Sequence, residues 1–221
     1  MDRRAAPDPA AFIAANLPLT ELPGLDGIRL HVARPGSRLS RLLGEGGAGE
    51  PPYWAYPWAG GLVLARYILD RPEIVRGRRV LDLGAGSGLV AIAAMKAGAK
   101  SALAAEIDRN GLAAIPLNAA ANGVALTATG EDLTRGGPPD VDIVLVGDLF
   151  YAPDLAQRVT AFLDRCITAG LEVLVGDPER AHLPHARLRR IAEYDVPDFG
   201  SPRPAGPSAV FAFTRPDPAA A

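Results

Sequence analysis

Three glycines and two carboxylates near the middle of the chain have the types and spacing needed to bind a charged ligand. Gly84, Gly86 and Gly88 interrupt the run VLDLGAGSGLV. Because they lack a Cβ, they let the backbone turn sharply and approach a ligand closely. The helix that should follow presents unpaired N–H groups and the positive end of its dipole to a negatively charged group. Asp82 precedes the loop and Glu106 ends the next apolar run. Both acids could therefore accept hydrogen bonds from ligand hydroxyl or ammonium groups.

The spacing of the glycines distinguishes two possible ligands. A dinucleotide fingerprint has the pattern GxGxxG and a small residue where the helix packs on the strand. This loop is GxGxG, and Leu89 follows it. Preceded by Asp82, the loop resembles motif I of the methyltransferases that use S-adenosylmethionine (AdoMet). That resemblance implies a ligand carboxylate at the loop amides, an ammonium at Asp82 and a ribose diol at Glu106. A turn that binds nothing is the alternative, but it leaves two acids at the ends of apolar runs without a use.

A second acidic segment follows the apolar run 141–146 and has the sequence GDLFY, from Gly147 to Tyr151. Ligands of open parallel sheets bind beyond the carboxyl ends of the strands, so this segment should face the same crevice as the glycine loop. Asp148 is therefore the main catalytic candidate. Its alternative role is a helix N-cap, but Pro153 or Asp154 starts the next helix better.

The segment PPYWAYPWAGG, residues 51–61, holds both tryptophans of the chain. So dense an aromatic group is either a hydrophobic plug under the sheet or a wall of the pocket, where rings stack on adenine or face a cation. For Trp54 the sequence does not distinguish between the two interpretations. Trp58 favours the pocket because it lies just before Gly60 and Gly61.

A further acidic pair, Glu131 and Asp132, follows the apolar run 125–129 and precedes Leu133. An acid here can accept the adenine amino group while a neighbouring N–H meets a ring nitrogen. Solvated loop acids are the alternative, and we favour the pocket only slightly.

Short apolar runs predict buried parallel strands, and stretches with apolar residues at helical spacing follow several of them. The strands are expected at 80–83, 102–105, 125–129, 141–146 and 171–175, and the helices at 9–16, 62–69, 89–97, 109–122, 153–166 and 183–190. Pro116 should kink its helix or mark a later start. Runs 191–196 and 209–214 have no helix between them and should pair antiparallel. We therefore expect an α/β fold: a doubly wound, mostly parallel Rossmann-like sheet with a C-terminal antiparallel hairpin.

Composition limits the function classes. The 221 residues, 48% of them hydrophobic, suit one α/β domain, and a formal charge of −2 gives no field for holding nucleic acid. The single cysteine, Cys166, excludes an internal disulfide and fits a reducing cytoplasm. His182 and His185 without further ligands make a poor metal site. No apolar run could span a bilayer and no secretory signal is evident, so we expect a cytoplasmic, monomeric protein without a membrane partner.

Taken together and in order, six motifs resemble the lysine methyltransferases of the electron-transfer flavoprotein β subunit: PYWAYPWAGG, VLDLGAGSGL, LAAEID, LNAAANG, GDLFY and VGDPER. The likeness covers about residues 50–180 and places the chain among the seven-strand AdoMet methyltransferases. It implies methylation of lysine ε-amines on that flavoprotein subunit, with AdoMet as methyl donor and no metal. Residues 1–50 match little and are expected to form a partly irregular extension, of which 34–50 is a loop, before a methyltransferase domain at 51–221.

The resemblance also assigns roles to residues. The DxFY-type motif puts Asp148, Phe150 and Tyr151 at the substrate lysine, although Tyr151 could equally belong to the core. Asp148 is a poor base for an ammonium of pKa near 10.4, so orientation of the lysine is the role expected of it. The cofactor positions, from the loop and the resemblance together, are Trp58, Asp82, Gly84, Ala85, Gly86, Gly88, Glu106, Ile107, Asp132, Leu133 and Gly147.

Two other functions stay open. A small-molecule N- or O-methyltransferase on the same fold would need an enclosed pocket with a lid. A non-catalytic AdoMet-binding protein would dock on a partner without turnover, but the presence of Asp148 argues for turnover.

Overall fold

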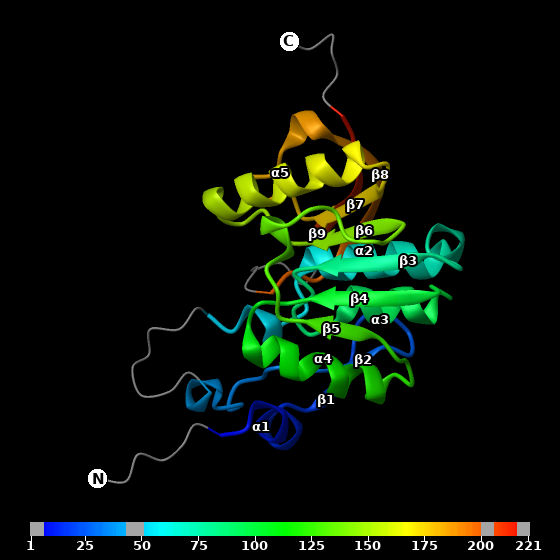
Figure 1. The fold of residues 1–221 in the computed structure, drawn as a ribbon. Coiled ribbons are helices and arrows are strands. Elements are labelled where there is room, and N and C mark those ends of the chain that lie inside the picture. Colours follow the sequence, from blue (N-terminus) through cyan, green and yellow to red (C-terminus); the bar gives the residue numbers. More distant parts are fainter. Residues whose placement is uncertain (1–6, 43–50, 200–205, 216–221) are drawn as a thin grey trace.

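A mostly parallel sheet lies at the centre of the chain in the computed structural model, which describes residues 7–42, 51–199 and 206–215 (Figure 1). The strand order among these residues is β5-β4-β3-β6-β7-β9-β8. Pairing is parallel from β5 to β7, whereas β9 runs antiparallel to both β7 and β8. The strands are β3 (Arg79–Leu83), β4 (Ser101–Ala105), β5 (Thr127–Thr129), β6 (Ile143–Gly147), β7 (Glu172–Asp177), β8 (Leu188–Val196) and β9 (Gly206–Phe213). The predicted fold class and the C-terminal antiparallel hairpin are confirmed.

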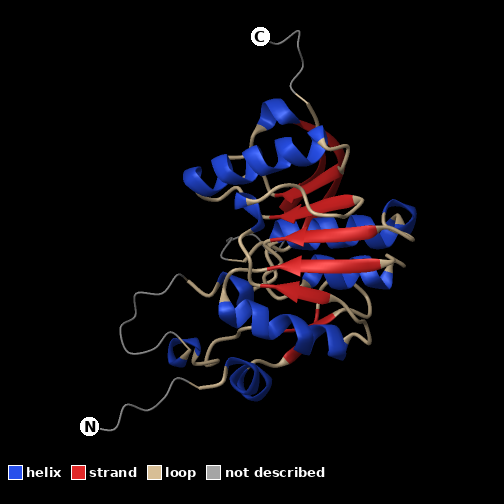
Figure 2. Cartoon of the chain, in the orientation of Figure 1, coloured by secondary structure: helices blue, strands red, loops and turns tan. Residues whose placement is uncertain are grey.

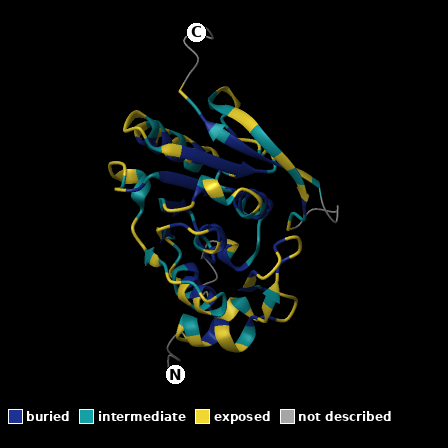
Figure 3. Cartoon of the chain, turned by 90° about the vertical axis from the view of Figure 1, so that its right-hand side faces the viewer, coloured by how far each residue is buried: buried dark blue, intermediate teal, exposed yellow. Residues whose placement is uncertain are grey.

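Helices cover both faces of this sheet (Figure 2). Helices α2 (Ala59–Asp70) and α3 (Leu89–Lys96) pack on the face that carries Val80 and Leu145. Helix α5 (Pro153–Thr168) packs on the opposite face, with Leu81 and Val146. Because both faces are covered, the central strands are buried throughout (Figure 3). This is why they form continuous apolar runs in the sequence instead of alternating ones.

The first part of the chain packs against helix α4 (Arg109–Ala121). It contains α1 (Pro9–Asn16) and an antiparallel pair, β1 (Leu19–Glu21) and β2 (Arg29–His31). The amide side chains of Asn118 and Asn122 accept hydrogen bonds from the backbone N–H groups of His31 and Arg29, at 2.8 and 3.0 Å. Side chains on α4 thus hold the edge of this segment, which shares the apolar core with the rest of the protein.

Several predicted elements differ from those observed. The helix expected at 183–190 is wrong: a single 3-10 turn covers His185–Arg187, and β8 begins at Leu188. Pairing of β8 with β9 overrides the local helical pattern. Helix α4 continues through Pro116, so the later start is wrong as well. Of the loop expected at 34–50, residues 43–50 lie outside the described part of the chain.

Glycines allow the start of α2 to lie directly on the ends of β6 and β7. A Cβ added to Gly60 would lie 2.3 Å from the carbonyl oxygen of Gly176, and one added to Gly147 would lie 2.9 Å from the Cα of Gly61. No other residue type fits at such distances without movement of the backbone. Helix α2 therefore begins at Ala59, three residues before its apolar run, and brings Trp58 to the strand ends.

Candidate active site

A cavity of about 420 Å³ opens where β3, β4 and β6 end. The glycine loop after β3, the acid after β4 and the GDLFY segment after β6 all contribute to its lining. The crevice expected beyond the carboxyl ends of the parallel strands is therefore present. Aromatic residues from the segment before α2 and the side chain of Arg180 after β7 complete the wall.

The glycine loop has the backbone conformation that its sequence requires. Gly84, Gly86 and Gly88 have φ values of 68°, 55° and 90°, in the left-handed region that side chains disfavour. Gly84 and Gly86 line the cavity, whereas Gly88 and Ala85 do not. Gly88 instead packs against Ile115 of α4, where an added Cβ would lie 3.4 Å from the side chain. We assign Gly88 to turning the chain into α3, not to ligand contact.

Glu106 joins the end of β4 to the glycine loop. Its carboxylate accepts hydrogen bonds from the backbone N–H of Gly86 and of Asp108, each at 2.7 Å. Burial raises the pKa of Glu106, and these backbone hydrogen bonds oppose the rise. A carboxylate has about four acceptor sites, so two are left for a ligand. Glu106 lines the cavity and can accept hydroxyl groups of a ribose there.

Asp82 does not reach this cavity. It lies inside β3 and shares a sheet face with Val80, under α3, where its carboxylate accepts the N–H of Ala91 at 2.8 Å. Its residue is 1% exposed, and burial raises its pKa to about 7. The expected contact with a ligand ammonium is therefore not supported, because the side chain is directed to the helix and not to the strand end.

Residues of the acidic segment after β5 stabilise a short helix and also line the cavity. Asp132 caps the short 3-10 helix Leu133–Arg135 and accepts the N–H of Thr134. The hydrogen bond from the Thr134 side chain lowers the pKa of Asp132, which favours its charged form. Asp132, Leu133 and the exposed Ile107 all line the cavity, as predicted.

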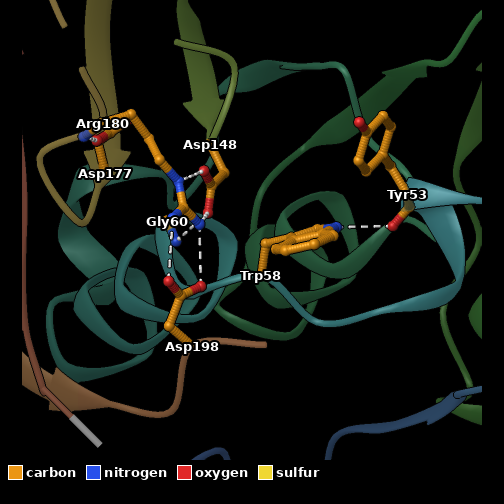
Figure 4. Close-up of polar contacts among 7 residues, drawn as sticks. All are labelled: Tyr53, Trp58, Gly60, Asp148, Asp177, Arg180 and Asp198. Atoms are coloured by element: carbon orange, nitrogen blue, oxygen red, sulfur yellow. Dashed lines mark hydrogen bonds and ion pairs between the residues drawn. The ribbon is translucent and has the colours of Figure 1, made fainter. Parts of the chain in front are cut away.

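An aromatic cluster forms one side of the mouth. The indole Nε1 of Trp58 donates to the carbonyl of Tyr53 at 2.8 Å (Figure 4). The Tyr53 ring lies 5.9 Å from that of Trp58 and 5.3 Å from that of Tyr151, between ring centres. Trp54 borders the cavity and packs in the cluster formed with α1 and α4, not under the sheet. Tyr53, Trp54 and Trp58 together form an aromatic wall of the cavity.

Phe150 and Tyr151 have different locations. Phe150 is fully buried among residues of β6 and α5 and does not line the cavity. Its expected place in a lysine channel does not fit the structure, because it belongs to the core between sheet and helix. Tyr151 is 43% exposed and lines the cavity, so the wall interpretation holds for it.

Asp148 lies at the end of β6 in an unusual backbone conformation. Its φ is 60°, and its backbone N–H donates to the carbonyl of Gly176 at 3.0 Å. Oδ2 accepts the backbone N–H of Gly60 at 3.0 Å. The side chain is only 7% exposed. A non-glycine residue stays in this region only where surrounding contacts hold it there.

The sequence did not reveal the partner of Asp148, which is Arg180. Its Nε and Nη2 donate to the two oxygens of Asp148 at 2.7 and 3.1 Å, and its Nη1 and Nη2 donate to Asp198 at 3.0 and 2.9 Å (Figure 4). The Arg180 backbone N–H donates to Asp177, whose pKa is raised to about 7 by burial. The motif VGDPER contains Asp177 and Arg180, but only the fold brings Arg180 to the end of β6.

Comparison with known proteins agrees with the fold. A family model described as ribosomal protein L11 methyltransferase (PrmA) matches residues 66–151. Magnesium protoporphyrin IX methyltransferase (ChlM) from Synechocystis PCC 6803, solved with bound SAM, superposes with a TM-score of 0.51 at 17% identity, covering 70% of this chain and 79% of that one. TrmN from Thermus thermophilus gives a TM-score of 0.51 at 24% identity, covering 68% of this chain and 48% of that one. These likenesses show the fold.

Sequence relatives are more specific. The electron transfer flavoprotein beta subunit lysine methyltransferase of Xenopus laevis is 38% identical over 202 residues, which are 89% of this chain and 82% of that protein. The human protein of the same name is 35% identical over 86% of this chain and 75% of its own length. This chain belongs to that methyltransferase family. The rat member is 40% identical, and the match covers 66% of this chain but only 60% of the rat protein.

In this member of the family, the cavity gathers most of the residues predicted from the sequence: Trp58, Gly84, Gly86, Glu106, Ile107, Asp132, Leu133, Gly147, Asp148 and Tyr151. Asp82, Ala85, Gly88 and Phe150 lie outside its lining. Among the described residues, no cluster of three or more His, Cys, Asp or Glu side chains could hold a metal ion, and no helix is long and apolar enough to cross a membrane.

Proposed function

We propose that this protein methylates lysine ε-amines of the electron transfer flavoprotein β subunit, with AdoMet as the methyl donor. The observation that carries the proposal is that one cavity contains both Glu106, joined to the glycine loop, and Asp148, at the neighbouring strand end. Family membership supports the reaction class, and the names of the relatives support the substrate.

The residues at the Glu106 end fit AdoMet. Glu106 keeps acceptor sites for the ribose hydroxyls, and the backbone of Gly84 and Gly86 lines the same cavity. Asp132 and Leu133 line the same cavity and are the residues we propose for the adenine. When bound, AdoMet supplies an electrophilic methyl group on a sulfonium. Asp82 lies outside the cavity lining and accepts the N–H of Ala91 in α3, so the proposal does not rely on it.

The residues at the Asp148 end fit a lysine side chain. Tyr53, Trp58 and Tyr151 offer aromatic faces that suit the alkyl stem of lysine and its cationic head. The carboxylate of Asp148 can accept a hydrogen bond from the amine and so fix its direction of attack. An amine held in line with the reacting carbon gains much of its rate from orientation alone.

The exposure of the aromatic rim favours a protein substrate over a small molecule. Tyr53 is 39% exposed and Tyr151 is 43% exposed, so the rings stand at the mouth where a chain segment can contact them. A small metabolite would gain little from half-exposed rings. We therefore keep the protein lysine as substrate.

The experiment is methyl transfer from labelled AdoMet to the purified flavoprotein β subunit, with free lysine in a parallel reaction. We expect label on the protein, located to lysines by peptide mass spectrometry, and at most trace label on free lysine. Efficient labelling of free amines with an unlabelled β subunit would overturn the substrate. A protein that binds AdoMet but labels neither acceptor, nor any protein of a cell extract, would overturn the activity.

A further inference from the structure

The guanidinium of Arg180 spans two carboxylates at the acceptor end of the cavity. It makes two hydrogen bonds to Asp148 and two to Asp198, all between 2.7 and 3.1 Å. The Arg180 side chain is 26% exposed, and its central carbon lies 5.9 Å from the centre of the Trp58 ring. Figure 4 shows the Arg180 guanidinium between the two acids, with Trp58 to one side of the group. A permanent positive charge is thus built into the place where a lysine nitrogen must arrive.

Asp148 has little capacity left for a substrate. An ionised carboxylate offers about four acceptor sites. Nε of Arg180 takes one site on Oδ1, while Nη2 of Arg180 and the N–H of Gly60 take two on Oδ2. One site on Oδ1 is left. A lysine ammonium has three donors, whereas a neutral amine that points its lone pair at a methyl group needs only one acceptor to fix it.

The positive charge of Arg180 acts in the same direction, against the acids beside it. Burial alone would lower the pKa of Arg180, but hydrogen bonds to Asp148 and Asp198 outweigh it and raise the pKa above its ordinary value, so the guanidinium stays charged. The positive charge of Arg180 offsets the negative charge of Asp148. With Asp198 included, the three side chains carry one net negative charge. The other charged or titratable groups facing the cavity or Arg180 are Tyr53, Glu106, Asp108, Glu131, Asp132, Tyr151, Arg158, Asp177 and Glu179, the last paired with Arg190.

We propose that Arg180 is a positioning residue which leaves Asp148 one acceptor site and, by its positive charge, favours the neutral amine of the substrate lysine over the ammonium there. The inference rests on the proposed function. The lysine ammonium first loses one proton to water. The nitrogen lone pair then forms a bond to the methyl carbon as the carbon–sulfur bond breaks, and that electron pair stays on sulfur. Asp148 accepts an N–H of the amine while its ion pair with Arg180 stays in place.

Substitution of Asp198 provides a control, because it should shift the protonation of the bound lysine in the direction opposite to substitution of Arg180. It binds the outer side of Arg180 and has no hydrogen bond to the backbone of β6 or α2 among those of the described residues. Neutralising Asp198 removes a negative charge near the amine, while neutralising Arg180 removes a positive one. The two changes should therefore move the protonation of the bound lysine in opposite directions.

The experiment is single-turnover methyl transfer to the flavoprotein β subunit across a pH series, with wild type, Arg180→Gln, Arg180→Lys and Asp198→Asn. The ascending limb of the plot of rate against pH reports the deprotonation of the bound lysine. We expect the limb to move up by roughly one pH unit or more in Arg180→Gln and down in Asp198→Asn. In Arg180→Lys the limb should stay near that of wild type, because the charge is kept, while the rate falls because the paired geometry is lost.

If the ascending limbs of the pH–rate profiles of wild type, Arg180→Gln and Asp198→Asn lie at the same pH, the inference is overturned while the proposed function stays intact. If Arg180→Gln does not fold or turn over, Asp198→Asn decides alone: a limb that moves down supports the inference, and one that stays or moves up overturns it. AdoMet titration of each variant, expected within about twofold of wild type, shows whether the cofactor end is intact. No transfer by wild type at any pH would overturn the proposed function and this inference with it.

Discussion

The backbone N–H of Gly60 lies 3.0 Å from Oδ2 of Asp148, so the first turn of α2 is joined directly to the end of β6. Asp148 has a left-handed backbone conformation, which for a non-glycine residue costs on the order of 1 kcal/mol. The Gly60 contact and the bond from the Asp148 N–H to Gly176 hold it there. Direct contact between helix and strand ends is thus what aims this carboxylate at the cavity.

Alanine substitution at Gly60 should destabilise the protein strongly. A Cβ there would lie 2.3 Å from the oxygen of Gly176 and 2.6 Å from the nitrogen of Asp148, so the helix must move off the strands. Overpacking of this kind costs about 1 to 3 kcal/mol or more. Gly61→Ala is the matched control, because its Cβ would meet only Leu89 at 3.6 Å and Ala is the better helix former. Urea unfolding should separate the two variants; equal midpoints would contradict the close contact.

Substitution of Glu106 by Ala should weaken AdoMet binding by at least tenfold. The change deletes charge-assisted hydrogen bonds of roughly 1.5 to 3 kcal/mol each and frees the N–H of Gly86 from its partner. Glu73→Ala removes an exposed acid away from the cavity and should leave affinity unchanged. Calorimetric titration measures both. Wild-type affinity in Glu106→Ala would remove this residue from the cofactor site.

Much of the fold follows from patterns that are local in the sequence. The runs 80–83 and 141–146 become central strands because burial on both faces favours apolar residues, with Asp82 as the buried exception in β3. The helix expected at 183–190 failed since pairing with β9 extends β8 back to Leu188, beyond the strand expected at 191–196. A periodicity within one segment carries no information about such pairing.

The site was predictable where strand ends carry the polar residues. Glu106 and Asp148 were found because carboxyl ends of parallel strands converge. Asp82 was misassigned since it lies one pleat inside the strand, where its side chain meets α3. Arg180 and Asp198 were not assigned, because an ion pair between residues 148, 180 and 198 depends on three loops meeting. The unassigned arginine in VGDPER was the only available signal.

The buried carboxyl of Asp82 should make the protein less stable as pH rises. Its pKa is about 7 in the folded protein and 3.8 in an unfolded chain, so the folded state holds a proton that the unfolded state has lost. The stabilisation from this group is complete below about pH 4 and is lost as pH rises through 7. Asp82→Asn keeps an acceptor for the Ala91 N–H and should flatten this decline, which amounts to a few kcal/mol in order of magnitude.

Urea unfolding between pH 4 and 8 tests this prediction. Asp177 has a pKa raised in the same direction, also to about 7, so Asp177→Asn should remove a separate part of the decline. We expect the double variant to have the flattest profile. A wild-type profile that falls no more steeply than that of Asp82→Asn would mean that the Asp82 carboxyl is ionised in the folded protein.

Replacement of Asp148 by Asn should abolish most turnover while preserving fold and cofactor binding. Asn tolerates the left-handed conformation better than most residues and keeps an acceptor for the Gly60 N–H, so the backbone at the end of β6 should persist. The charge that pairs with Arg180 and orients the amine is lost, and misplacement by about an ångström lowers a rate on the order of a hundredfold. The matched control is Asp142→Asn, which breaks an ion pair with Arg79 before the start of the same strand and outside the cavity. AdoMet titration and methyl transfer to the flavoprotein β subunit are the two measurements. Near-normal turnover in Asp148→Asn would make the carboxylate structural, and loss of AdoMet affinity together with turnover would move it into the cofactor site.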